Sequence, residues 1–170
     1  MSHWDNSPLF VRFSRDHEQV VKLGENLKVL LKGATPCDIQ DLASARWAFA
    51  SALMQTLAIK ERHIYAKLEH DPRPIVGAFF QRSKIDLLKR FEAYTSHMEE
   101  WPTYRVTSDW LVYRSKAINV VDALIERLHW EQREMFPFVE RHQIDITMPA
   151  SVTSNWVRQA FTVKDSVEKL

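Results

Sequence analysis

The sequence predicts an all-α fold, an up-down-up-down four-helix bundle with a short C-terminal helix. The chain of 170 residues contains only 3 glycines and 7 prolines, fewer than an all-β fold of this size uses in its turns. Apolar side chains recur at alternating spacings of three and four residues, as on helices that pack in a bundle, and no strand-like alternation is found. The length fits a single domain over residues 1–170, with the bundle core at about 8–141 and a C-terminal segment at 150–170.

The first helix is expected from about residue 8 to Gly33. Ser7-Pro8 or Ser14 could cap its start, because serine accepts a hydrogen bond from a free backbone N–H and proline tolerates the first helical position. Gly33 closes it, since glycine readily adopts the backbone conformation that ends many helices. The apolar stripe of this helix consists of Phe13, His17, Val20, Gly24, Leu27 and Leu31.

The second helix is expected to begin at the run Thr35-Pro36-Cys37-Asp38. In it, Thr35 is the N-cap, Pro36 takes the first helical position and Asp38 lies in the first turn, where the helix dipole favours negative charge. The helix ends before Asp71-Pro72-Arg73-Pro74, because proline cannot continue a helix. Its stripe consists of Leu42, Arg46, Phe49, Leu53, Thr56, Lys60 and His63.

The third helix is expected from about Ile75 to Glu100, and Pro102 ends it. The fourth begins near the capping run Thr107-Ser108-Asp109, and Pro137 is expected to kink or terminate it. A short amphipathic helix capped by Ser154 is expected to pack across the bundle end. The two long stripes consist of Phe80, Lys84, Leu87, Phe91, Tyr94, Met98 and Trp101, and of Trp110, Tyr113, Ala117, Val120, Leu124, Arg127, Leu128, Glu131, Met135 and Phe138.

Composition and charge exclude several classes of protein. The 23 basic and 22 acidic side chains leave a formal charge of +1, which does not support nucleic-acid binding or attraction to an anionic membrane. The longest weakly polar run, residues 47–59, is shorter than the roughly 20 residues of a membrane span, and the first residues lack a signal-peptide pattern. A single cysteine, Cys37, forms no intramolecular disulfide. We therefore expect a cytoplasmic protein that binds neither nucleic acid nor membrane.

Polar side chains interrupt the apolar stripes at one depth of the bundle. Counted from the expected helix ends, they fall within about 6 Å of one another along the bundle axis, at roughly 1.5 Å per residue. Buried charges are costly unless they are paired or bound to something. The alternative is that the lysines lie at stripe edges and reach solvent. The predicted polar layer consists of His17, Lys60, Lys84, Arg127 and Glu131.

Two arrangements of this layer are possible, and they differ in the direction in which the Glu61 side chain points. If Glu61 and Glu131 both point inward, the layer is a self-neutralising network in which Arg127 pairs with Glu131 at i,i+4. If Glu61 points to solvent, the excess positive charge favours a small anion, such as phosphate or a carboxylate metabolite, held by charge-assisted hydrogen bonds. We favour the network, because paired interior charges are the commoner solution.

Three segments resemble motifs of the hemerythrin-like HHE cation-binding family. Asp16-His17 resembles the Asp-His opening of its first helix. The run from Lys60 to Leu68 is similar to its Glu-Glu-x-x-Leu-Tyr-Pro-x-Leu end of helix 2, and the run from Glu131 to Pro137 to its Glu-Glu/Asp-x-x-Leu-Phe-Pro end of helix 4. The likeness spans about residues 9–141. It implies a four-helix bundle around a non-haem di-iron centre, with ligands of the type His, His-x3-Glu, His and His-x4-Asp/Glu.

Most of the ligand positions implied by this resemblance are substituted. His17 matches the histidine of helix 1, but Lys60 stands where the glutamate of helix 2 would be and Arg127 replaces the histidine of helix 4. A cationic side chain repels a metal ion and offers it no lone pair, so we expect the cavity to exclude iron. The positions of this former metal cavity are His17, Thr56, Lys60, Lys84, Arg127, Glu131 and Gln132.

These observations favour a binding or regulatory module of hemerythrin-like fold that has lost its di-iron site and holds no cofactor. An enzyme is less favoured, because three glycines cannot build a nucleotide-binding loop and no local catalytic signature is found. The alternative is a hemerythrin-like non-haem iron protein that binds or senses oxygen or an oxidant through substituted ligands. The alternative metal ligands are His17, Glu61, His63 and Glu131.

Tryptophans outside the helix seams suggest an interaction surface. The chain has six tryptophans, and aromatic side chains are enriched at protein interfaces. They could instead pack under loops. If they form a patch, the protein binds a partner protein or associates with itself. The tryptophans off the seams or at their edge are Trp4, Trp47, Trp110 and Trp156.

Overall fold

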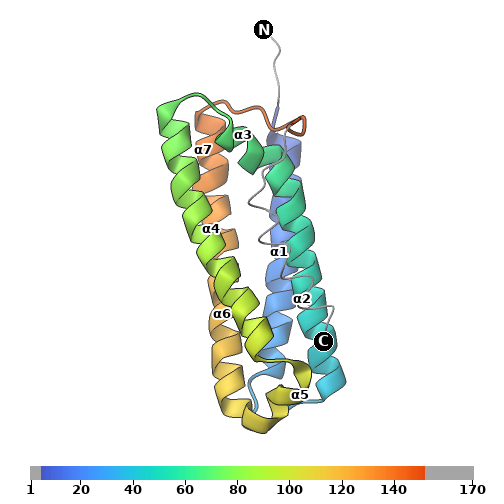
Figure 1. The fold of residues 1–170 in the computed structure, drawn as a ribbon. Coiled ribbons are helices and arrows are strands. Elements are labelled where there is room, and N and C mark those ends of the chain that lie inside the picture. The colour runs from blue at the N-terminus through green and yellow to red at the C-terminus, as the bar shows by residue number, and fades with distance from the viewer. Residues whose placement is uncertain (1–4, 152–170) are drawn as a thin grey trace.

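The computed structural model describes residues 5–151, and this part of the chain is helical, without a strand. Four long helices lie side by side in Figure 1: α1 (Ser7–Leu30), α2 (Ile39–Lys60), α4 (Pro74–Glu100) and α6 (Trp110–Trp130). Helix α1 packs against α2 and α6, and α4 packs against α6. The all-α prediction is confirmed for these residues, whereas the predicted helix after residue 154 lies outside them.

Short helical elements extend the long helices or connect them. Two of them are π-helical: η1 (Glu61–Tyr65) continues α2, and η3 (Glu131–Met135) continues α6. They lead into α3 (Ala66–Glu69) and α7 (Phe136–Arg141), which lie at one end of the bundle, while α5 (Thr103–Val106) lies at the other end (Figure 1). We call these the α3/α7 end and the α5 end.

The start of α2 corrects one prediction. The helix begins at Ile39, and its N-cap is Asp38, whose Oδ1 accepts hydrogen bonds from the backbone N–H groups of Gln40 and Asp41 at 2.9 and 3.0 Å. Thr35 is therefore not the cap. The physical reason is that one carboxylate oxygen of Asp38 satisfies two N–H groups that the first helical turn leaves without a partner.

Prolines set the limits of the later helices. Helix α4 starts at Pro74 and ends at Glu100, as predicted to within a residue. Helix α6 follows a 3-10 turn, η2 (Thr107–Asp109). Pro137 does not terminate the fourth helix, because α7 continues through it directly after the π-helical segment. The wider π-turn places the proline where its missing N–H and its ring no longer break the helix.

The long helices bury a continuous apolar core along their facing stripes. Phe13 and Phe49 have no solvent exposure, and Leu124 is nearly as buried. The helices approach closely at Gly24 of α1, where an added Cβ would lie 2.9 Å from Ile125 Cδ1 and 3.0 Å from a ring carbon of Phe49. The glycine therefore allows α1 to pack directly against α2 and α6.

The structure bears in part on two predictions, the absence of a membrane span and the exposure of the tryptophans. None of the helices over residues 5–151 combines the length and the apolar character that a membrane-spanning helix needs. Trp47 is 45% exposed, but Trp110 is buried and its Nε1 donates to Gly33 O at 2.9 Å. Trp110 therefore packs under a loop rather than on an interaction surface. Trp4 and Trp156 lie outside the described residues.

Candidate functional site

The polar layer is centred on Glu131, the first residue of η3, whose side chain has no solvent exposure. Its Oε1 accepts hydrogen bonds from the Tyr65 hydroxyl and from Arg127 Nε, the latter at 3.1 Å. Its Oε2 accepts a hydrogen bond from Lys60 Nζ and lies 3.2 Å from His17 Nε2. A carboxylate offers about four acceptor sites, and the hydrogen bonds from Lys60, Tyr65 and Arg127 fill three of them. Three long helices therefore meet on one buried negative charge.

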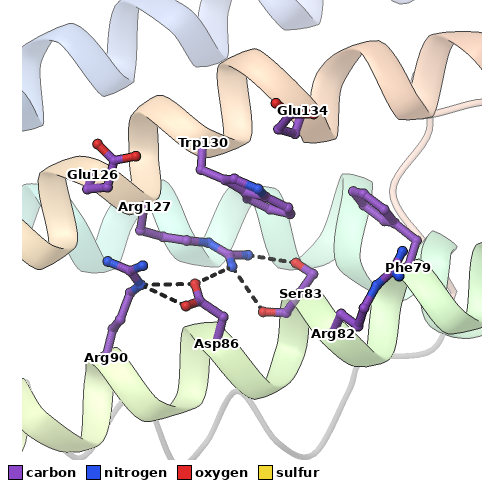
Figure 2. A pocket seen from close by; sticks show the side chains of 9 residues that line it. All are labelled: Phe79, Arg82, Ser83, Asp86, Arg90, Glu126, Arg127, Trp130 and Glu134. Atoms are coloured by element: carbon purple, nitrogen blue, oxygen red, sulfur yellow. Dashed lines mark hydrogen bonds and ion pairs between the residues drawn. The ribbon is translucent and has the colours of Figure 1, made fainter.

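Arg127 connects this carboxylate to helix α4. Its Nη1 donates to Ser83 O at 3.0 Å and to Asp86 Oδ2 at 2.9 Å. Its Nη2 donates to the Tyr65 hydroxyl at 3.1 Å and to Ser83 Oγ at 2.7 Å. With the bond from Nε to Glu131, every N–H of the guanidinium has an acceptor. Figure 2 shows the side chain reaching from α6 to Ser83 and Asp86 on α4.

The π-helical segment η1 brings two of these donors together. A π-turn is closed by a hydrogen bond between residues five apart, so such residues lie on one face, whereas in an α-helix they point about 140° apart. In η1 the closing bond runs from the N–H of Ala66 to Glu61 O. Lys60 and Tyr65, five residues apart, can therefore both bind Glu131.

The segment η3 repeats this arrangement on the other side of the site. Its closing bond runs from the N–H of Phe136 to Glu131 O. These two residues, again five apart, both contact His17: the carboxylate lies 3.2 Å from Nε2, and the Phe136 ring stacks on the imidazole at 5.5 Å and 30°. Each widened turn thus adds a second contact from the same helix face.

The charged groups of the network lie beside groups of opposite charge. Burial alone would raise the pKa of Glu131, but Lys60, His17 and Arg127 hold it well below its usual value, so the carboxylate is ionised. Burial, reinforced by the charge of Lys60, lowers the pKa of His17, which is therefore neutral at pH 7. Burial also lowers the pKa of Lys60, against the attraction of Glu131. The cations Lys60 and Arg127 face two carboxylates, Glu131 and Asp86.

The contribution of α4 to this layer differs from the predicted one. Lys84 is half-buried, and its Nζ lies 5.9 Å from the centroid of the Phe80 ring. The contacts that α4 makes with Arg127 come from Ser83 and Asp86 instead. The correction follows from the rotation of α4, which turns the buried Ser83 toward α6 and leaves its neighbour Lys84 at the edge of the core.

The other predicted cavity residues surround the network. Thr56 is buried and Gln132 is half-buried. Glu61 is also buried, at 4% exposure. His63 is half-buried, and its Nδ1 lies 2.8 Å from Ile146 O in the segment that follows α7.

These residues do not fit the di-iron centre that the resemblance implies. Glu131 accepts hydrogen bonds from an ammonium, a guanidinium and a phenol, and a cation that displaced the ammonium or the guanidinium would strand a buried charge. Within residues 5–151, no group of three or more His, Cys, Asp or Glu side chains is arranged to hold a metal ion. The alternative ligands His17, Glu61, His63 and Glu131 do not form such a group.

A groove lies on the outer side of the network, between α4 and α6 (Figure 2). Its volume is about 460 Å³. The rings of Phe79 and Trp130 stack at 5.7 Å and 17°, and Arg127 Cζ lies 4.5 Å from the Trp130 centroid. The guanidinium that binds the buried Glu131 therefore also forms part of the groove wall. The lining residues are Phe79, Arg82, Ser83, Asp86, Arg90, Glu126, Arg127, Trp130 and Glu134.

Sequence reasoning missed three members of the network, Tyr65, Ser83 and Asp86. Tyr65 is five residues after Lys60 and falls off the seam of an ideal α-helix, although it lies inside the family-like motif. Asp86 could have been noticed through its i,i+4 partner Arg90, to which it is ion-paired at 2.9 Å. Ser83 carries no signal of its own, because a lone serine on a helix is common.

No protein-family model matches the chain, and neither a curated protein nor a solved structure does. The hemerythrin-like resemblance therefore rests on its three motifs alone.

Proposed function

We propose that this chain is a metal-free binding module of hemerythrin-like, up-down-up-down architecture, in which an ionic network takes the place of the metal. The observation that carries the proposal is that Lys60, Arg127 and Tyr65 all donate hydrogen bonds to Glu131, which also lies 3.2 Å from His17 Nε2 of α1. The network links these helices at the depth where the family keeps its metal. A module of this kind needs no ion to hold its interior together.

The groove between α4 and α6 is the recognition site in this proposal. Phe79 and Trp130 form an apolar platform, and platforms of this kind anchor partner side chains. Arg90 is committed to Asp86, whereas Arg82 is exposed and has no hydrogen bond or ion pair with residues 5–151. The occupant is a segment of a partner protein that places an apolar side chain on the rings and a carboxylate on Arg82.

A selection of random peptides tests the recognition site. Peptides selected on the wild-type protein are expected to carry an apolar residue close to an acidic one, since the groove offers rings beside a free guanidinium. Their affinity is expected to fall about tenfold or more in Trp130→Ala and in Arg82→Glu, the effect of losing one central contact. Arg12→Glu, which reverses an arginine that is 58% exposed on α1, is the control. Equal binding by all variants contradicts the assignment of the groove.

Iron analysis tests the metal-free interior. Protein purified without a His-tag is expected to contain far less than one iron per chain and to show no visible absorption band, because Lys60 and Arg127 hold the acceptor sites of Glu131. The measurement is elemental analysis with a visible spectrum of the same preparation. Stoichiometric iron that is lost in His17→Ala would establish the iron-protein alternative instead.

A further inference from the structure

A second buried arginine, Arg46, lies in α2 toward the α5 end of the bundle. It is 2% exposed and lies about 21 Å from Lys60 along the helix axis, at roughly 1.5 Å per residue. Its Nη2 donates to Trp101 O at 2.8 Å and lies 3.5 Å from Met98 Sδ. Its Cζ lies 5.7 Å from the centroid of the Tyr113 ring. All of these contacts are with neutral groups.

Comparison with Arg127 shows what Arg46 lacks. Both arginines are 2% exposed. Arg127 uses every N–H and contacts two carboxylates, Glu131 and Asp86. In Arg46 the buried Nε and Nη1 have no hydrogen-bond partner, and no carboxylate of residues 5–151 forms an ion pair with it. A buried cation without a counter-charge is costly, and a bound anion would offset that cost.

Two further buried groups without a hydrogen-bond partner belong to Trp101 and to Thr103, two residues later in the sequence. Trp101, whose carbonyl binds Arg46, has a buried Nε1 with no acceptor, and the buried Oγ1 of Thr103 has no partner either. An indole N–H only donates, and a threonine hydroxyl can donate. Among the described residues of the α5 end, the buried polar side-chain atoms left unsatisfied can thus all donate a hydrogen bond.

The titratable groups at this end do not supply the missing negative charge. Burial, together with the charge of Arg46, lowers the pKa of His97 to about 4, so it is neutral at pH 7. Burial raises the pKa of Tyr94 and of Tyr113, so both phenols stay protonated. Burial likewise raises the pKa of the Cys37 thiol. Glu100, the nearby carboxylate that acts on His97, is ion-paired with Lys116 at 2.8 Å.

We propose that Arg46, Trp101 Nε1 and Thr103 Oγ1 form a binding site for a small anion. The anion belongs to the class of halides, nitrate and formate-sized carboxylates, because Arg46 and Trp101 are 2% and 1% exposed and an anion bound to them lies in the protein interior, where a small group is accommodated most easily. The guanidinium provides the charge, and the indole N–H and the hydroxyl complete the coordination by hydrogen bonds. This site is independent of the proposed function and lies at the other end of the bundle.

Thermal unfolding tests the site. At equal ionic strength, bromide, nitrate or formate is expected to raise the Tm of the wild type relative to gluconate by about 3–6 °C at roughly ten times the dissociation constant. Arg46→Met is expected to show no such rise. Arg12→Met, which removes an arginine that is 58% exposed, is expected to keep it. An equal rise in Arg46→Met, or no rise in the wild type, overturns the proposal.

A direct measurement covers the case in which Arg46→Met does not fold. Crystals of the wild-type protein grown in bromide are expected to show an anomalous-scattering peak within hydrogen-bond distance of Arg46 Nε or Nη1. Finding only water at that position overturns the proposal, because the donors would then be satisfied without a negative charge.

Discussion

Arg127→Met is expected to lower the free energy of unfolding by about 3–5 kcal/mol, because it leaves the buried Glu131 without one of its counter-charges. The substitution also removes the hydrogen bonds that the Ser83 carbonyl and hydroxyl accept from this guanidinium. Urea unfolding at pH 7, followed by circular dichroism, measures the loss. The effect is large because every N–H of Arg127 is in use and none is exposed to water that could replace it.

Two further variants separate the buried network from its exposed edge. Arg90→Met removes the other arginine bound to Asp86, but this pair is partly exposed, so a loss of about 1 kcal/mol or less is expected. The triple variant Lys60→Met, Arg127→Met, Glu131→Leu is expected to recover most of the loss, since apolar side chains of similar volume can replace a whole buried ion network. If Arg127→Met is as stable as the wild type, the network does not hold the helices together.

Acidification from pH 7 to pH 4 is expected to destabilise the fold by about 3 kcal/mol through His97 alone. The folded-state pKa of His97 is about 4, below the ordinary value of 6.5. Between these two values the unfolded chain binds a proton that the folded chain does not. The stability contribution is therefore complete above about pH 6.5 and is lost as the pH falls to 4. His17 has the same sign, since burial lowers its pKa.

His97→Phe is the matched variant for this pH dependence. The imidazole of His97 stacks on the Tyr113 ring at 5.6 Å and 17°, and phenylalanine keeps an aromatic ring there while it removes the titrating group. Urea unfolding at several pH values is expected to give a flatter profile for the variant above pH 4. Parallel profiles for the variant and the wild type contradict the assignment of this pH dependence to His97.

The helices could be predicted from the sequence because their signals are local. The two prolines before α4 and Pro102 after it define that helix almost to the residue. The stripe position of Lys60, Arg127 and His17 also predicted their burial, because a residue on the apolar stripe of a helix faces the neighbouring helices. Thr35 was misassigned because two N-cap candidates lie close together, and only the hydrogen bonds distinguish them.

The composition of the network could be predicted only in part. A periodicity of 3.6 residues assumes unbroken α-helices, and under it Tyr65 points away from Lys60. The π-turns change this relation. A proline follows η3, but neither α2 nor η1 contains one, and no other residue in η1 indicates a π-turn. The choice between Ser83 and Lys84 depends on a rotation of α4 that its neighbours determine. The lack of a carboxylate partner for Arg46 within residues 5–151 could not be predicted either, because it depends on which side chains of the other helices lie next to it.

The two π-turns also mark where this chain can change length. Each holds one residue more than the α-turn it replaces, over about the same rotation. Deleting one residue between Lys60 and Tyr65 would therefore restore an unbroken α-helix and leave the residues after it on the same faces. Lys60 and Tyr65 would then be four residues apart, still on one face, and Leu68, which has no solvent exposure, would stay in the core. A one-residue deletion in the regular part of a long helix would instead rotate everything after it by about 100°. One-residue gaps are thus expected in the π-turns and in connecting segments such as 31–38.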